Sequence, residues 1–326
     1  MHVHIQMRRG PMQRVHLYKS VAAASVAIMA SSLIAACGAS KTTGSDATGT
    51  ASAGNSDTGS ASTSKTLTIP IASGWAEDEA VSYLWQYVLQ KKGYQVKLPT
   101  LDIGVIFAGI SKGSSSNVDV FFDTWLPTTH KAYWAKIHNK VEDIGIWYDQ
   151  ATLNLAVPKY MTNVNSIADL KGKASLFNGH ITGIDPGAGE TGIVKNNVLN
   201  DYGLSGFTVQ TSSSAAMLAA LSKAIDAKQP IVVTLWHPHW AYKAFPIKDL
   251  KDPKKSMGSG DKIHVIAKTG FKTAHPDVYA ALAKFKMTDA QLADLENVAL
   301  QKYKNNPAAG VAAWAKTHQS FVNAMM

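Results

Sequence analysis

Apolar residues recur with two different periods along residues 65–326, and the change of period separates candidate strands from candidate helices. Short apolar runs at Leu67–Ala72, Tyr94–Leu98 and Val118–Phe122 predict strands. In residues 77–92 and 105–112 the apolar residues lie three and four positions apart, which predicts amphipathic helices. Strands that alternate with helices in this way are typical of an α/β protein.

A second series of alternating elements follows. The run Leu153–Val157 predicts a strand that crosses out of the first series, and Lys262–Ala267 predicts a strand that returns to it. Helices at residues 190–199 and 215–227 and a strand at Ile231–Leu235 are predicted between these two crossings.

Two crossings imply two lobes with a cleft between them. Their predicted extents are 65–154 with 266–326 for the first lobe and 155–265 for the second. Polar residues mark some of the helix starts. Ser166 is placed as an N-cap, and Thr288 with Gln291 forms a capping box.

The first 36 residues are typical of a signal peptide. An uncharged stretch at residues 21–36 follows a basic segment and is shorter than the roughly 20 residues that a membrane-spanning helix needs. It ends in Ile34-Ala35-Ala36-Cys37, which resembles a bacterial lipobox and implies cleavage before Cys37 and lipidation of its thiol. The basic residues are Arg8, Arg9, Arg14 and Lys19.

Residues 37–64 consist of Cys37 and a segment made almost entirely of Gly, Ser, Thr and Ala, which predicts a disordered tether behind a lipid anchor. Because Cys37 is the only cysteine, no disulfide is expected. Removal of the four basic residues of the signal peptide lowers the formal charge from +9 to +5. No Lys/Arg run with interleaved aromatics is present, so a nucleic-acid partner is not expected.

Three of the eight tryptophans follow predicted strands and lie beside Gly or Pro: Trp75, Trp125 and Trp236. Large aromatics outside a periodic apolar stripe are typical of the lining of a ligand site. The faces of indole rings can hold a cation that has no N–H to donate, such as a quaternary ammonium group. Of the other tryptophans, Trp85, Trp134 and Trp314 are assigned to the core and Trp147 to the hinge. The assignment of Trp240, to the core or to the site, is left open.

A glycine-rich turn from Asp185 to Gly192 formally matches Gly-x-Gly-x-x-Gly. A dinucleotide site is rejected, because no clean apolar strand precedes the turn and no acidic residue lies about 20 positions further on. What remains is a turn that opens a helix, whose free N–H groups can hold a carboxylate. A cation cage together with an anion nest describes a site for a zwitterion.

Three histidines leave a metal site open as an alternative: His130, His237 and His239. It is disfavoured, because a proline separates the last two and no Cys or carboxylate lies close in sequence. His130 is better placed as a donor to an anionic ligand group. No Gly-x-Ser-x-Gly or His-Glu-x-x-His motif is present, so neither an enzyme nor a cofactor is expected.

Four stretches carry a resemblance to a known family: Gly-Trp-Ala-Glu, Asp-Thr-Trp-Leu-Pro-Thr-Thr-His, Gly-Ile-Asp-Pro-Gly-Ala-Gly and Leu-Trp-His-Pro-His-Trp. In this order they resemble the substrate-binding proteins of glycine betaine, proline betaine and choline ABC importers, from about Leu67 to the C-terminus. The resemblance implies a two-lobed periplasmic-binding-protein fold of type II, with two crossover strands, which closes on its ligand at a hinge.

The resemblance also implies the roles of particular residues. Aromatic side chains of such proteins box the trimethylammonium group, which here implicates Trp75, Trp125 and Trp236. Main-chain N–H groups and a histidine bind the carboxylate, which implicates the backbone of Gly189 and Glu190 and the side chain of His130. Possible secondary contacts are Glu77, His239 and Trp240.

Two glutamates bear on the choice of ligand. Glu190 stands where an apolar residue is expected and brings a negative side chain near the anion nest. Glu77 follows Trp75 by two residues, and choline-specific relatives use an acidic side chain in this motif. The preferred interpretation of Glu77 is a helix start, where an acid interacts favourably with the helix dipole.

These observations predict an extracytoplasmic, lipid-anchored receptor that captures glycine betaine or a related quaternary-ammonium solute and delivers it to an ABC permease and its ATPase. A choline or carnitine receptor of the same fold is the alternative. A more remote alternative is a metal-dependent surface hydrolase that uses His130, His237 and His239.

Overall fold

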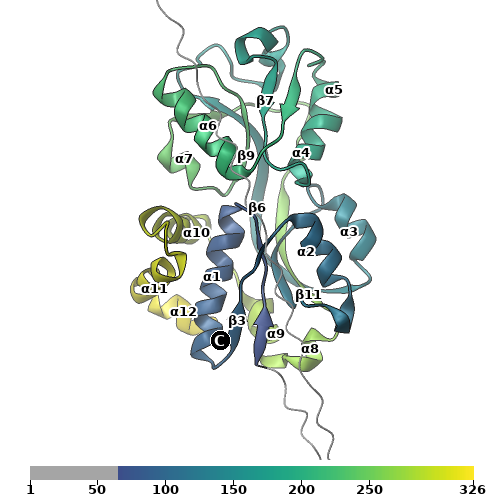
Figure 1. Cartoon of the computed structure of the whole chain (residues 1–326), viewed down its shortest axis with the longest axis vertical. Coiled ribbons are helices and arrows are strands. Elements are labelled where there is room, and N and C mark those ends of the chain that lie inside the picture. The colour runs from purple at the N-terminus through teal and green to yellow at the C-terminus, as the bar shows by residue number, and fades with distance from the viewer. Residues whose placement is uncertain (1–64) are drawn as a thin grey trace, which may run out of the picture. The chain divides into compact units, whose positions relative to one another are not determined.

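One long strand, β6 (Val141–Pro158), runs through both halves of the folded chain (Figure 1). The computed structural model describes residues 65–326, so the predicted signal peptide, lipidated cysteine and tether lie outside the described residues. The described residues belong to one compact unit, and its buried core residues run from Leu67 to Met325.

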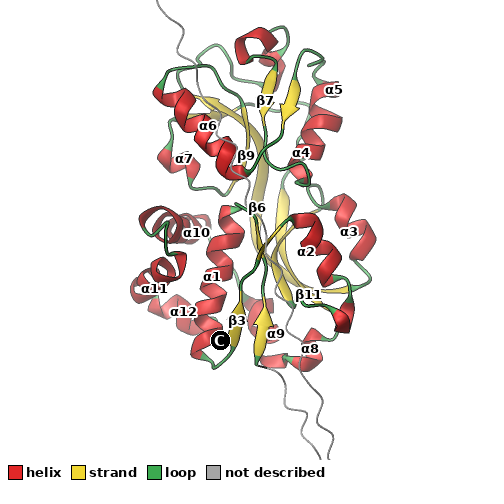
Figure 2. Ribbon diagram, viewed as in Figure 1, coloured by secondary structure: helices red, strands yellow, loops and turns green. Residues whose placement is uncertain are grey.

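The sheet changes partners along β6. Its first part, from Val141 to Ala151, pairs antiparallel with β11 (Asp261–Lys268), which also pairs antiparallel with β5 (Val120–Leu126). Its second part pairs antiparallel with β9 (Val233–His237) and β10 (Ile247–Asp249). One strand therefore belongs to two lobes, and Figure 2 shows it passing between them.

The first lobe is built around β5, β11 and the start of β6, and its helices lie on both sides of these strands (Figure 1). Two further pairs of short strands are parallel, β1 with β3 and β2 with β4. Its remaining elements are β1 (Thr66–Thr68), β2 (Ile71–Ala72), α1 (Ala76–Lys91), β3 (Gln95–Lys97), β4 (Thr100–Leu101), α2 (Ile103–Ile110), a 3₁₀ turn (Gly113–Ser115), α3 (Lys131–Ile137), α8 (Phe271–Ala274), α9 (Pro276–Lys284), α10 (Asp289–Glu296), a π-helical turn (Asn297–Lys302), α11 (Pro307–Thr317) and α12 (Gln319–Ala324).

The second lobe is built on the end of β6 with β9, and continues through two parallel strands. Its remaining elements are two 3₁₀ turns (Ile167–Leu170 and Ala174–Phe177), β7 (His180–Thr182), α4 (Gly189–Ile193), a π-helical turn (Val194–Val198), α5 (Leu199–Asp201), β8 (Thr208–Gln210), α6 (Ser214–Asp226) and α7 (Ala241–Ala244). Since α4, the π turn and α5 follow one another directly, the helix predicted at 190–199 is present as one continuous helical segment.

Local signals in the sequence predicted the helix starts correctly. The Ser166 side chain accepts from the N–H of Ala168 at the first 3₁₀ turn, and Thr288 forms a capping box with Gln291 at α10. These caps need only neighbouring residues, because the side chain satisfies an N–H of the helix's own first turn.

Two strand predictions were wrong in detail. Residues 67–72 form two strands rather than one, because β1 pairs with β3 while β2 pairs with β4, and Pro70 between them has no N–H to donate. Trp125 was expected just past a strand, but it lies within β5, where it is paired with Ile263 of β11. The partner strand extends β5 beyond the apolar run that marks it in the sequence.

The lobe boundaries follow from the same pairing. The whole of β11 lies beside β5 and the first part of β6. We therefore propose that the chain returns to the first lobe before Asp261, rather than at the predicted residue 266.

Two of the tryptophans assigned to the core, Trp85 and Trp314, are buried, whereas Trp134 is half-buried. Trp147 is buried too and stacks on Phe285 at 5.7 Å.

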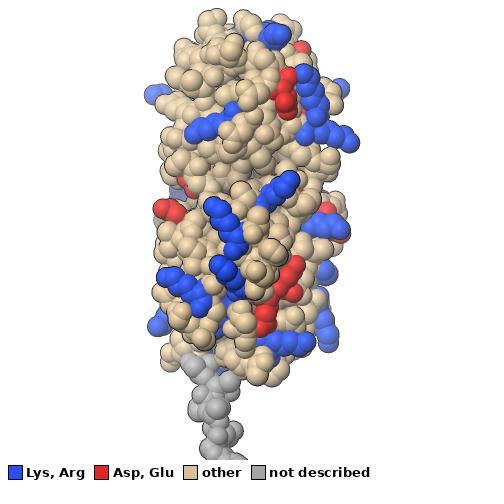
Figure 3. All heavy atoms as spheres, turned by 90° about the vertical axis from the view of Figure 1, so that its right-hand side faces the viewer, with Lys and Arg blue, Asp and Glu red and all other residues tan. Residues whose placement is uncertain are grey.

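The surface view turned by 90° shows Lys side chains spread from one lobe to the other, with acidic side chains among them (Figure 3). This face therefore carries no continuous basic stripe. Within residues 65–326, none of the helices has the length and apolar character needed to span a membrane.

Candidate functional site

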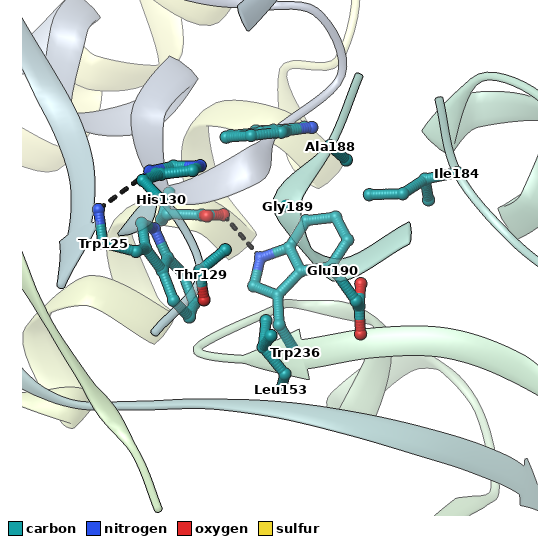
Figure 4. Close-up of a pocket in the computed structure, with 11 residues that line it drawn as sticks. Trp125, Thr129, His130, Leu153, Ile184, Ala188, Gly189, Glu190 and Trp236 are labelled. Carbon is teal, nitrogen blue, oxygen red and sulfur yellow. Dashed lines mark hydrogen bonds between the residues drawn. The ribbon is translucent and has the colours of Figure 1, made fainter. Parts of the chain in front are cut away.

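A cavity with about 270 Å³ of empty space is lined by residues of both lobes (Figure 4). It brings together seven residues that the sequence singled out, although their ligand roles remain a proposal. Those residues are Trp75, Glu77, Trp125, His130, Gly189, Glu190 and Trp236.

Three indole rings from three different elements form much of the cavity wall. Trp75 caps the start of α1, Trp125 lies in β5 and Trp236 lies near the end of β9. All three are buried, and the rings of Trp75 and Trp236 lie 6.5 Å apart at an angle of 59°. Gly74 allows the chain to turn immediately before Trp75, because its φ of 77° is in the left-handed region that favours glycine.

Two of these indoles have their N–H groups engaged by carboxyl oxygens. Trp125 donates its Nε1–H to Oδ1 of Asp123 at 2.7 Å, and Trp236 donates to Oε2 of Glu77 at 2.8 Å. An indole whose N–H is already bonded offers a ligand only its ring. Such rings attract a cation through their faces, so the wall is suited to a group that needs no hydrogen bond.

His130 is neutral, and its protonated nitrogen follows from its contacts. Its Nδ1 accepts the backbone N–H of Trp125 at 3.0 Å (Figure 4), so the ring proton is on Nε2. The residue is fully buried, and burial lowers its pKa to about 3. Its ring stacks on Trp75 at 5.6 Å and 6°.

The Nε2–H of His130 is buried and has no hydrogen-bond partner among the described residues. An unpaired buried donor is costly, and it is commonly satisfied by a ligand or a water. Because His130 also lines the cavity, its geometry suits donation to an acceptor inside it.

The start of α4 lies against the first lobe at Thr129. A Cβ on Gly189 would lie 2.0 Å from the carbonyl oxygen of Thr129, so only glycine permits this approach. Thr129 is held by Asp261, whose Oδ2 accepts from its N–H at 2.9 Å and from its hydroxyl at 2.5 Å. The first N–H groups of a helix have no partner within the helix, so the backbone of Gly189 and Glu190 faces the cavity as a candidate anion nest.

The side chain of Glu190 is only 2% exposed. Figure 4 shows its carboxyl group beside the indole of Trp236. Burial raises the pKa of Glu190 well above its ordinary value, while the backbone N–H groups of Asn154 and Leu235 act in the opposite direction. If Glu190 is neutral, the negative charge that its residue type predicts beside the anion nest is absent.

Four further acids are buried in the first lobe. Burial raises the pKa of Asp123 to about 7 and that of Glu296 to about 8. Burial also raises the pKa of Glu77 and of Asp78 well above the ordinary values, and the charge of Asp123 adds to both shifts. None of the four has a salt-bridge partner among the described residues.

Two of the secondary candidates, His239 and Trp240, do not line the cavity. His239 is buried and lies edge-on to Trp236 at 4.8 Å, and its Nδ1 accepts the N–H of Ala241. His237 points elsewhere, to Asp249 at 2.8 Å. No group of three or more His, Cys, Asp or Glu side chains suited to a metal ion occurs within residues 65–326.

Four lining residues were not singled out from the sequence: Thr129, Leu153, Ile184 and Ala188. Thr129, Ile184 and Ala188 lie inside stretches that carry the family resemblance, but nothing else in the sequence marks them as lining residues. Leu153 begins the run that marks the first crossing, and a position at a crossing between lobes is the one signal that could have found it.

Comparison with known proteins agrees with this geometry. Residues 65–317 match the family model described as the substrate binding domain of ABC-type glycine betaine transport systems. The glycine betaine/carnitine transport binding protein GbuC of Listeria monocytogenes is 40% identical over 146 residues, which are 41% of this chain and 48% of GbuC. The match therefore spans about half the length of that relative.

Two solved structures share the fold over most of their length. The glycine betaine, L-proline-binding protein ProX of Borrelia burgdorferi has a TM-score of 0.74 and 28% identity, with 80% of this chain and 96% of ProX covered. Lactococcal OpuAC, in its closed-liganded conformation with glycine betaine, has a TM-score of 0.72 and 33% identity, with coverages of 80% and 98%. The predicted two-lobed periplasmic-binding-protein fold is thus confirmed, and the chain belongs to the family of substrate-binding domains of ABC-type glycine betaine transport systems.

Proposed function

We propose that this protein is a receptor that binds glycine betaine, or a close quaternary-ammonium relative that also carries a carboxylate, between its two lobes. The observation that carries the proposal is one cavity in which indole faces lie beside the unpartnered Nε2–H of His130. Ring faces attract the trimethylammonium group, and the imidazole N–H donates to the carboxylate. The cage would consist of Trp75, Trp125 and Trp236.

The carboxylate would receive further hydrogen bonds from the backbone N–H groups of Gly189 and Glu190 at the start of α4. This geometry supplies donors from both lobes to one small anion, because His130 belongs to the first lobe and α4 to the second. A ligand that accepts from both would favour the closed state.

The state of Glu77 favours a betaine over choline. Glu77 lines the cavity and could accept from the hydroxyl of choline, but its Oε2 already accepts from Trp236. Its raised pKa also favours the neutral acid, which does not repel a ligand carboxylate. Choline or carnitine binding is the second candidate, because an acidic side chain does line the cavity.

The family and the N-terminal sequence support a proposed cellular role. The receptor would hand its ligand to a permease with an ATPase, and it would act outside the membrane, held there by a lipid on Cys37 and a tether of residues 38–64. We propose a transport role for it rather than a catalytic one.

Calorimetric titration of residues 60–326 with glycine betaine and with choline tests the ligand. We expect glycine betaine to bind at least about tenfold more tightly, since a charge-assisted hydrogen bond contributes roughly 1.5–3 kcal/mol. Tighter binding of choline would instead make Glu77 a ligand contact.

Trp125→Ala tests the cage in the same titration. A desolvated cation–π contact contributes about 2 kcal/mol, so affinity for glycine betaine should fall roughly 30-fold. Trp134→Ala removes a half-buried indole that does not line the cavity and is the matched control. A loss of less than about twofold for Trp125→Ala would exclude Trp125 from the cage.

A further inference from the structure

Glu77 and Trp236 form a buried hydrogen bond between the two lobes. Glu77 is the second residue of α1 in the first lobe, and Trp236 lies in β9 of the second, 159 positions away in sequence. The Nε1–H of Trp236 donates to Oε2 of Glu77 at 2.8 Å, and the two residues are 3% and 1% exposed. Figure 4 shows this bond as a dashed line from the indole. Its two partners come from different lobes, so a movement that separates the lobes at this point would break it.

The bond also sets the position of the Trp236 ring. The indole lies 4.8 Å from the ring of His239 at 90° and 6.5 Å from that of Trp75. Rotation about χ1 and χ2 sets the orientation of the indole, and a hydrogen bond to Nε1 favours one setting of these torsions. Its acceptor is therefore the group that orients Trp236 against Trp75 in the cage.

The surroundings of Glu77 leave it few other functions. Asp123 of β5 and Glu296 of α10 both face it and raise its pKa, and burial does so most strongly. No cation among the described residues forms a salt bridge with it. The indole N–H is the one side-chain donor to its carboxyl group within residues 65–326.

We propose that Glu77 is a positioning residue whose hydrogen bond with Trp236 latches the two lobes and completes the cage, rather than a contact to the ligand. The inference rests on the proposed function, because the cage is the part of the site that the latch completes. In the open state both groups are exposed to water, so closure exchanges two hydrogen bonds to water for one buried bond and one bond between the released waters. The net gain is modest, and losing it should weaken ligand affinity about tenfold.

A double-mutant cycle separates the latch from other effects of Glu77. Glu77→Gln keeps an oxygen that can accept the indole N–H, whereas Glu77→Met keeps the volume and removes the acceptor. Trp236→Phe keeps an aromatic face and removes the donor. We expect Glu77→Met to weaken binding of glycine betaine about tenfold and Glu77→Gln to change it by less than about threefold. Once Trp236→Phe is present, Glu77→Met should change affinity by less than about twofold.

Glu79→Met is the matched control, because Glu79 lies on the same helix and has no hydrogen bond to the second lobe. It should leave affinity unchanged. The latch is overturned if Glu77→Gln binds glycine betaine as weakly as Glu77→Met does, since Glu77 would then act by its charge. It is also overturned if the losses of Glu77→Met and Trp236→Phe add in full.

The closed population of the ligand-free protein gives a second readout that needs no ligand. Spin labels on cysteines introduced at Lys112 and Lys223, both exposed and in different lobes, report the distance between the lobes. We expect Glu77→Met to lower the closed fraction and Glu77→Gln to preserve it. If the wild-type protein does not bind glycine betaine, the proposed function fails while this measurement still tests the latch. In that case, equal closed fractions in the wild type and Glu77→Met would overturn it.

Discussion

The proton of His130 is assigned by a single contact. Its Nδ1 accepts the backbone N–H of Trp125, which leaves Nε2 as the donor, and burial keeps the ring neutral with a pKa of about 3. A neutral imidazole that is held in one tautomer is a fixed donor across the physiological pH range. The ring stacks on Trp75, so in the proposed site one residue would both support the cage and offer a bond to the anion.

At this scale we predict that His130→Leu separates the two candidate ligands. Affinity for glycine betaine should fall about tenfold or more, because a hydrogen bond to a charged group is lost. Affinity for choline, which has no carboxylate, should change by less than about threefold. Calorimetry with both ligands measures the difference, and His138→Leu, at an exposed position on the same segment, is the control. Equal losses for both ligands would mean that His130 acts only by packing on Trp75.

Among the elements, the start of α4 decides how closely the lobes approach. Gly189 begins this helix and lies against the carbonyl of Thr129, whose loop is held by the carboxylate of Asp261. A helix start that carries a side chain could not come so close. The glycine is therefore needed for contact between lobes, and no strained φ is involved, because Gly189 is not among the glycines with positive φ.

Gly189→Ala should accordingly impair closure without unfolding either lobe. Its Cβ would lie 2.0 Å from the oxygen of Thr129, and overpacking of this kind costs about 1–3 kcal/mol, or roughly 5- to 150-fold in affinity for glycine betaine. Gly192→Ala adds the same methyl group one turn later, where nothing lies within 4 Å, and should not weaken binding. Titration together with thermal unfolding of both variants measures this. Unchanged affinity in Gly189→Ala would show that the ligand is bound without this approach.

Across the whole molecule, buried acids couple stability to pH. Asp123, with a pKa of about 7, and Glu296, with a pKa of about 8, are neutral in the folded protein at a pH where the unfolded chain ionises them. A raised pKa contributes stability that is lost as the pH rises through the folded value. The buried histidines, His130 and His239, affect stability at lower pH. Burial lowers their pKa values to about 3, so the folded protein is destabilised as the pH falls below about 6.5, where the unfolded chain takes up the protons.

Between pH 7 and 8.5 the acids should dominate. We predict that the free energy of unfolding of residues 60–326 falls by on the order of 1 kcal/mol over this range. Asp123→Asn with Glu296→Gln should remove the part of the fall that these two acids cause, since neither amide titrates. Urea unfolding at several pH values measures it. A free energy of unfolding that rises with pH in the unsubstituted protein would contradict the assignment of these carboxyl groups as neutral.

The sequence by itself determined the features that depend on near neighbours. The period of the apolar residues predicted the α/β order. The capping residues predicted the helix starts at Ser166 and Thr288, because a cap forms its hydrogen bond within its own turn. Trp75, Trp125 and Trp236 follow predicted strands beside Gly or Pro, and this position predicted that they line a cavity. The family resemblance then supplied the two-lobed fold, which the comparisons confirm.

Only the tertiary structure decided what depends on groups far apart in the chain. The pairing of Trp125 with Ile263 extended β5 beyond its apolar run, and the contact between Gly189 and Thr129 showed why a glycine is needed there. The bond between Glu77 and Trp236 joins residues whose local sequence contains no sign of each other. Burial, which raises or lowers the pKa of a side chain, is likewise set by the packing of distant segments, so the charge state of the site could not be read from residue types alone.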